Sequence, residues 1–282
     1  MISLAEHENN GRNGFLRNRR ELLVGNFYAL MGSFLQQWQE AKRTAGYATF
    51  VIAGIPNVIV LAYIANRSDN PVAITYIALG SSLMLVWTNA VFEMGWSLTG
   101  ERWSGLLDVS LSSRTPVMVT MLGKALALAF FSTLTGAGAF VIILIASQHA
   151  VPILNIPFAA GSLAITMFVL ICTGFIFCPI TVLVGEPSGL FAMVMPFGVV
   201  CSGFLYPISL LPAALRFIAR GLPTSWAMES LIMATTGSGS TGEIIGKWAV
   251  ALLLAMVYLF VTQLLFRLVE WRIRVTAALS TL

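Results

Sequence analysis

The sequence predicts an all-α integral membrane protein, and three observations support this fold class. Only 10% of the residues are charged and 57% are hydrophobic, whereas about 25% of the residues in an ordinary soluble domain are charged. The mean hydropathy is +0.85, and a soluble chain of 282 residues could not hide that much apolar surface from water. No Asp, Glu, Lys or Arg occurs between Lys124 and Glu186, an interval that can hold two passes of roughly 20 residues each.

Charge-free apolar length predicts a six-helix transmembrane domain within residues 46–270. The expected spans are residues 46–65, 73–97, 122–147, 159–184, 188–207 and 246–268. A polar stretch at 98–121 separates the second span from the third and forms the one substantial cytoplasmic loop. The chain ends, residues 1–21 and 271–282, are expected to be cytoplasmic tails, of which the first is polar.

Residues 22–45 predict an amphipathic helix that lies in the membrane interface rather than across it. Apolar side chains recur every three to four residues from Leu23 through Phe27 to Trp38, which places them on one stripe of a helix. Basic residues flank this segment on both sides, as is typical of helices that bind an anionic leaflet. Membrane lipid is therefore an expected partner.

Residues 208–236 predict a re-entrant pair of short helices on the external side. The segment is moderately apolar but is broken by Pro212, Gly221 and Pro223, so a single uninterrupted span does not fit. Broken backbone at membrane depth is tolerated where protein shields it or where it faces a water-filled cavity. Two helices that enter the membrane part-way satisfy this condition.

The Lys and Arg residues predict the orientation. Placing both termini in the cytoplasm leaves twelve basic residues inside and four outside, namely Arg67, Arg216, Arg220 and Lys247. Because short cytoplasmic loops carry the excess of Lys and Arg, we expect both termini to lie in the cytoplasm of a bacterial-type inner membrane. The two histidines and three cysteines show no metal-ligand pattern, so we expect no metal or cofactor in this chain.

The cytoplasmic loop combines charged and apolar residues in a short space. Glu101, Arg102, Asp108 and Arg114 are interleaved with Leu107 and other apolar residues. A short amphipathic helix of this kind could insert into a groove of a soluble partner. The alternative interpretation is a plain interfacial loop.

Two motifs give the chain a resemblance to the permeases of type-2 ABC transporters over about residues 20–270. The first is the ordered set Glu101, Gly105, Leu107-Asp108, Pro116 and Gly123-Lys124, which resembles the cytoplasmic loop of that family. The second resembles the segment that follows the fifth span in the same family: Ser202-Gly203-Phe204-Leu205-Tyr206-Pro207-Ile208, then Leu211-Pro212, Arg216 and Leu222-Pro223.

The resemblance implies that the loop is a coupling helix that docks on an ATPase subunit. The coupling residues would be Glu101, Arg102, Gly105, Leu107, Asp108 and Arg114. Glu186, in the turn between the fourth and fifth spans, is either a second contact or a solvated turn residue. The chain lacks the G-x-x-x-x-G-K-[ST] phosphate loop, so ATP and Mg would be bound by a separate ABC ATPase subunit, in two copies or as a related pair. A second permease chain, identical or related, would complete the transporter; no nucleic acid is expected.

The resemblance further implies that the fifth span lines the substrate path or the dimer interface. Candidate residues there are Phe191, Phe197, Gly198, Ser202, Phe204 and Tyr206, and Gly198 with Ser202 form a small-xxx-small pair that lets helices approach closely. Glu93 is the deepest acid, and it is either functional or a hydrogen-bonded structural group. The re-entrant segment contains Pro207, Pro212, Arg216, Arg220 and Pro223; its arginines either meet an anionic group or snorkel to the headgroups.

These features predict the transmembrane permease of an ATP-driven exporter that moves an amphipathic drug, lipid or lipid-linked product outward. A permease for a lipid-linked glycan shares this architecture and is the alternative. A membrane-embedded lipid-modifying enzyme is less favoured, because Glu93, Glu101 and Asp108 have no histidine nearby in the sequence.

Overall fold

The computed structural model of the chain describes residues 24–42, 46–67, 70–103, 105, 116–147, 154–184 and 187–280. These residues form helices and turns, and no strand occurs among them. Four stretches are long and apolar enough to cross a membrane: Val72–Glu101, Val117–Ala146, Ile156–Val184 and Thr241–Arg272. The all-α prediction is therefore confirmed for the described residues, and these four stretches are consistent with a membrane protein.

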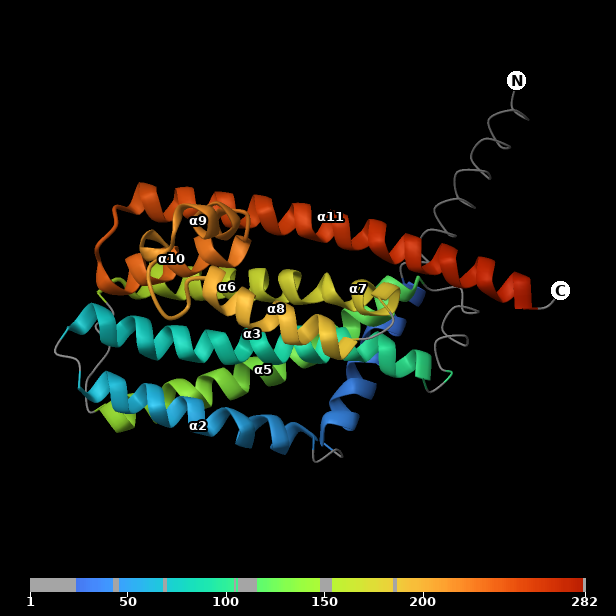
Figure 1. The fold of residues 1–282 in the computed structure, drawn as a ribbon, viewed down its shortest axis with the longest axis horizontal. Helices are drawn as coiled ribbons and strands as arrows, with labels where there is room; N and C mark the ends of the chain where they lie inside the picture. Colours follow the sequence, from blue (N-terminus) through green and yellow to red (C-terminus); the bar gives the residue numbers. More distant parts are fainter. Residues whose placement is uncertain are drawn as a thin grey trace, which may run out of the picture.

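The long helices, with α6 and α7 taken as one, run alternately in opposite directions and lie side by side along one axis of the molecule (Figure 1). In chain order they are α2 (Gly46–Asn66), α3 (Pro71–Trp103), α5 (Val117–Ser147), α6 (Ile156–Phe175), α7 (Phe177–Val184), α8 (Pro187–Cys201), the 3₁₀ helix η1 (Ile208–Leu210), α9 (Ala213–Arg220), α10 (Pro223–Thr236) and α11 (Thr241–Ser280). Residues 24–42 form a further helix, called here the 24–42 helix. Helices α9 and α10 lie at one end, and the end of α3 and the C-terminus lie at the other.

Each predicted span coincides with helical structure, but several boundaries differ from those expected. Helix α3 continues to Trp103 and α5 begins at Val117, so the connection between them is shorter than the predicted 98–121. Helix α11 continues through most of the predicted tail, as far as Ser280. An apolar window marks where lipid ends, whereas a helix ends only where its backbone hydrogen bonds stop.

The fourth predicted span is divided into α6 and α7 by a break at Ile176. Pro179 explains the break, because its ring clashes with the carbonyl of the residue four positions earlier, which is Phe175. The two pieces together still form a stretch of 29 residues that is apolar enough to span a membrane.

Helix α3 is the centre of the bundle and packs against α2, α5, α6, α7, α8 and α10. Within its most apolar window 56% of the residues are buried, compared with 22% for α11. Exposed apolar side chains such as Leu253, Met256 and Phe260 cover the outer face of α11, as expected for a helix that faces lipid.

Helix α8 is shorter than the predicted fifth span. Its 15 residues correspond to about 22 Å of helix, which is less than the ~30 Å hydrocarbon core of a bilayer. After Cys201 the chain forms turns through Tyr206 before η1 begins. Two short helices, α9 and α10, follow as predicted for residues 208–236.

Candidate functional site

A buried ion pair closes the base of the loop that joins α3 to α5. Lys124 Nζ lies 2.5 Å from Glu101 Oε1, and the two side chains are only 7% and 10% exposed. Both residues belong to the first family-like motif, from opposite ends of the loop. Because a buried ion pair is costly to break by removing one partner, the pair fixes the ends of α3 and α5 relative to each other.

The 24–42 helix packs on α5 beside this ion pair. A Cβ at Gly123 would come 2.3 Å from the carbonyl oxygen of Leu30, so only glycine allows the two backbones to approach so closely. Further along, the Trp38 ring lies 4.7 Å from that of Phe131 and 5.3 Å from that of Phe130. The glycine next to Lys124 therefore positions the 24–42 helix against the base of the loop.

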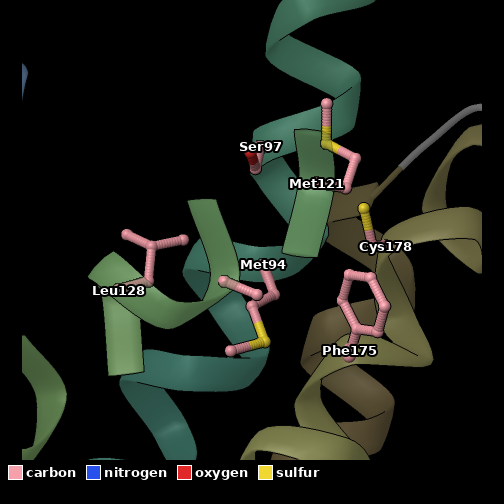
Figure 2. Close-up of a pocket in the computed structure, with 7 residues that line it drawn as sticks. Met94, Ser97, Met121, Leu128, Phe175 and Cys178 are labelled. Atoms are coloured by element: carbon pink, nitrogen blue, oxygen red, sulfur yellow. The ribbon is translucent and has the colours of Figure 1, made fainter. Parts of the chain in front are cut away.

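A narrow apolar pocket lies between α3, α5 and the α6–α7 break (Figure 2). It is lined from α3 by Met94 and Ser97, from α5 by Met121, Ala125 and Leu128, and from the α6–α7 break by Phe175 and Cys178. The space does not admit a water molecule. It is a packing defect of the core rather than a passage for a substrate.

The deepest acid, Glu93, is half-buried on α3. Its carboxylate lies within electrostatic range of Glu40 on the 24–42 helix. Asn89, one turn earlier, donates a hydrogen bond from Nδ2 to Thr135 Oγ1 of α5 at 3.2 Å. This face of α3 is therefore turned toward α5 and the 24–42 helix.

The structure places several candidate residues of the fifth span in the interior of the chain. Phe204 is completely buried, and its backbone carbonyl lies against Gly80, where a Cβ would come within 1.6 Å of the oxygen. The Trp87 ring packs against Gly198, and a Cβ added to Gly198 would lie 2.1 Å from the Trp87 Cη2 atom. Ser202 Oγ and Thr224 Oγ1 are hydrogen-bonded at 2.9 Å. Phe197, in contrast, is 44% exposed, and Tyr206 donates to the Val200 carbonyl at 3.3 Å.

The arginines of the 208–236 segment have partners within the chain. Arg216 donates to the carbonyl oxygens of Ser209 and Leu211 at 2.6 and 2.9 Å. Arg220 donates to Glu229 Oε2 at 3.3 Å, and Lys247 of α11 donates to the same oxygen. Pro207 and Pro212 precede η1 and α9, and Pro223 begins α10, as expected for residues that lack a donor N–H.

Some of the candidate residues lie outside the described part of the chain. These are Leu107, Asp108 and Arg114 of the loop, and Glu186 of the turn before α8. Gly105 is described as a turn residue with a φ of 72°, a left-handed conformation that favours glycine. Arg102 and Phe191 belong to α3 and α8, but their side chains lie outside the described structure.

The sequence analysis did not predict the charge cluster that Arg220, Glu229 and Lys247 form beside the Trp226 ring. The arginine guanidinium and the lysine ammonium lie 4.4 and 5.4 Å from the centroid of the Trp226 ring. Glu229 and Lys247 are 18 residues apart, so helical spacing does not connect them. The one feature of the sequence that could have indicated an ion pair is that Glu229 and Lys247 carry opposite charges in a stretch with few other charged residues.

Neither protein-family models nor curated proteins identify a relative of the chain. No protein-family model matches it. No curated protein matches it either. The fold defines a helical membrane protein, and the permease resemblance rests on the two sequence motifs.

Proposed function

We propose that this chain is the transmembrane permease subunit of an ATP-driven exporter. The observation that carries the proposal is the buried Glu101–Lys124 pair, which joins the first and last parts of the coupling-like motif at the base of one loop. A loop whose two ends are fixed to α3 and α5 transmits a displacement to both helices. A loop with free ends would absorb that displacement in its own backbone.

The surroundings of the loop support the same function. The end of α3, the 24–42 helix and the C-terminal part of α11 lie at one end of the bundle (Figure 1), and this is the end where the positive-inside rule places the cytoplasm. We propose that α2, α3, α5, α6–α7, α11, and α8 together with the turns that follow it to Tyr206 make six crossings. We further propose that α9 and α10 form the external re-entrant pair and that both chain termini are cytoplasmic. A cytoplasmic ATPase would then reach the loop directly.

The remaining parts of the transporter belong to other chains in this proposal. An ABC ATPase subunit supplies the ATP and Mg site, and a second permease chain completes the pathway. The exposed apolar residues of α8, Met193 and Phe197, face that second chain or the cargo. The cargo is an amphipathic molecule, because α8 offers it apolar rather than charged side chains.

Charge reversal in the loop tests the coupling assignment. The Asp108→Lys variant is expected to lower recovery of the ATPase subunit in co-purification about tenfold, which corresponds to ~1.4 kcal/mol of binding free energy. Like charges placed across an interface oppose binding. The matched control is Asp69→Lys, in the sequence between α2 and α3, and it should leave recovery unchanged. Equal recovery with Asp108→Lys and wild type would refute the coupling-loop assignment.

A further inference from the structure

The Arg220, Glu229 and Lys247 side chains form a cluster with more positive than negative charge. Two cations donate to a single carboxylate oxygen, Glu229 Oε2. One carboxylate cannot neutralise two cations, and their mutual repulsion at this distance favours an additional anion nearby. The cluster is located where α9, α10 and α11 meet, at the end of the bundle away from the α3–α5 loop (Figure 1).

The arginine is the accessible member of this cluster. The Arg220 side chain is 39% exposed, whereas those of Lys247 and Glu229 are 16% and 18% exposed. A guanidinium has five N–H donors, and within the described residues Glu229 is the one acidic partner of Arg220. Donors therefore remain for a ligand that approaches from the surface. Planar, multidentate donation of this kind suits phosphate oxygens.

The two other charges near the cluster, on Arg216 and Glu243, are of opposite sign and leave its net positive charge unchanged. Arg216 lies one turn before Arg220 on α9 and adds a third positive charge, although its guanidinium also donates to two backbone carbonyls. Glu243 lies one turn before Lys247 on α11, where its carboxylate accepts the Ser240 N–H at 2.9 Å. This capping interaction places the Glu243 charge at the N-terminus of α11.

The apolar surroundings of the cluster favour a lipid as the source of such a phosphate. Phe217, one turn before Arg220, is 83% exposed, and Leu210 in the preceding 3₁₀ helix is 74% exposed. Both cations lie over the Trp226 ring, and the Trp226 indole N–H donates to the Arg220 carbonyl at 2.9 Å. Exposed apolar side chains beside a tryptophan and basic groups are typical of the membrane interface. Free phosphate would gain nothing from the apolar residues.

We propose that the Arg220–Lys247 cluster binds the phosphate of an anionic phospholipid in the leaflet at the α9 end of the protein. The lipid phosphate accepts hydrogen bonds from Arg220, and Phe217 contacts the adjoining apolar part of the lipid. This site is independent of the proposed transport function, since it requires neither an ATPase nor a cargo.

Photo-crosslinking of the full-length chain in nanodiscs tests the site. The probe is a phosphatidylglycerol with a photoreactive group next to its headgroup, and the readout is the labelling of residues 206–250, mapped by peptide mass spectrometry. A phosphatidylcholine with the same group is the comparison lipid. We expect phosphatidylglycerol to label these peptides about fivefold more strongly, the effect of roughly one basic residue at a membrane surface.

Two variants with opposite expected signs separate a binding site from a structural ion pair. Arg220→Gln should lower the labelling by phosphatidylglycerol about fivefold, whereas Glu229→Gln should raise it by a similar factor because it frees both cations. Arg67→Gln, which removes an exposed cation stacked on Tyr63, is the matched control and should change nothing in these peptides. If Arg220→Gln does not fold, the Glu229→Gln variant still decides.

Three results would overturn the proposal. The first is equal labelling by the two lipids. The second is reduced or unchanged labelling in Glu229→Gln, which would mean that the carboxylate only supports the fold. The third is loss of labelling when millimolar inorganic phosphate is added, because that would identify a site for free phosphate and not for a lipid.

Discussion

Lys124→Met is expected to destabilise the protein by about 3–5 kcal/mol, the usual cost of leaving one member of a buried ion pair without the other. Lys124 and Glu101 are both less than a tenth exposed, so water cannot replace the lost partner. The measurement is the unfolding free energy of the purified protein in mixed micelles titrated with a denaturing detergent. The helical signal in circular dichroism reports the transition.

A double variant distinguishes the ion pair from simple packing. Glu101→Met combined with Lys124→Met should recover most of the stability, because replacing both charges with apolar groups removes the uncompensated one. The matched control is Lys42→Met, on the exposed face of the 24–42 helix. Its ammonium lies 5.0 Å from the Trp38 ring, and its loss should cost less than about 1 kcal/mol. If the double variant is as unstable as Lys124→Met, the pair does not act as described.

Gly80→Ala is expected to destabilise the fold by about 3 kcal/mol or more, at the upper end of the usual cost of overpacking. The added Cβ would come within 1.6 Å of the Phe204 carbonyl oxygen and 2.6 Å of its carbon. Both are backbone atoms, so no side-chain rotation can relieve the clash. The turn after α8 must move away from α3, and the buried Phe204 ring moves with it.

Gly138→Ala is the matched control for this substitution. Gly138 lies in the interior of α5, and a Cβ there would meet nothing within 4 Å. Because alanine is the better helix former by roughly 0.5–1 kcal/mol, the control should be neutral or slightly stabilising in the same detergent titration. If Gly80→Ala unfolds at the same denaturant concentration as Gly138→Ala, the turn is not held against α3.

The sequence was sufficient to predict the class of fold. A helix that spans a bilayer needs a long segment without charged residues, and the length of such segments can be read directly from the sequence. It also located the proline-broken segment that forms α9 and α10. Helix ends were harder to predict. Helix α3 passes beyond its predicted span to Trp103, because a charged residue such as Glu101 ends an apolar window but is a good helix former. The break at Ile176 is indicated by Pro179 and not by the hydropathy of the segment.

The candidate site was predictable in part. The first motif contains Glu101 and Lys124, but sequence spacing could not reveal that their side chains meet across 23 positions. Phe204 belongs to the second motif, and its complete burial against α3 follows from Gly80, which no local pattern connects to it. The charge cluster was hidden for the same reason, because Arg220, Glu229 and Lys247 come from three different helices.

The central proposal is that the chain is the membrane half of a machine whose ATPase is a separate polypeptide. The most direct measurement is affinity purification of the tagged chain from its native membranes, followed by identification of co-purifying chains and an assay of ATP hydrolysis. The proposal predicts recovery of a polypeptide with a G-x-x-x-x-G-K-[ST] phosphate loop and vanadate-sensitive hydrolysis in the mixture. Recovery of the chain without such a polypeptide and without that hydrolysis would contradict it.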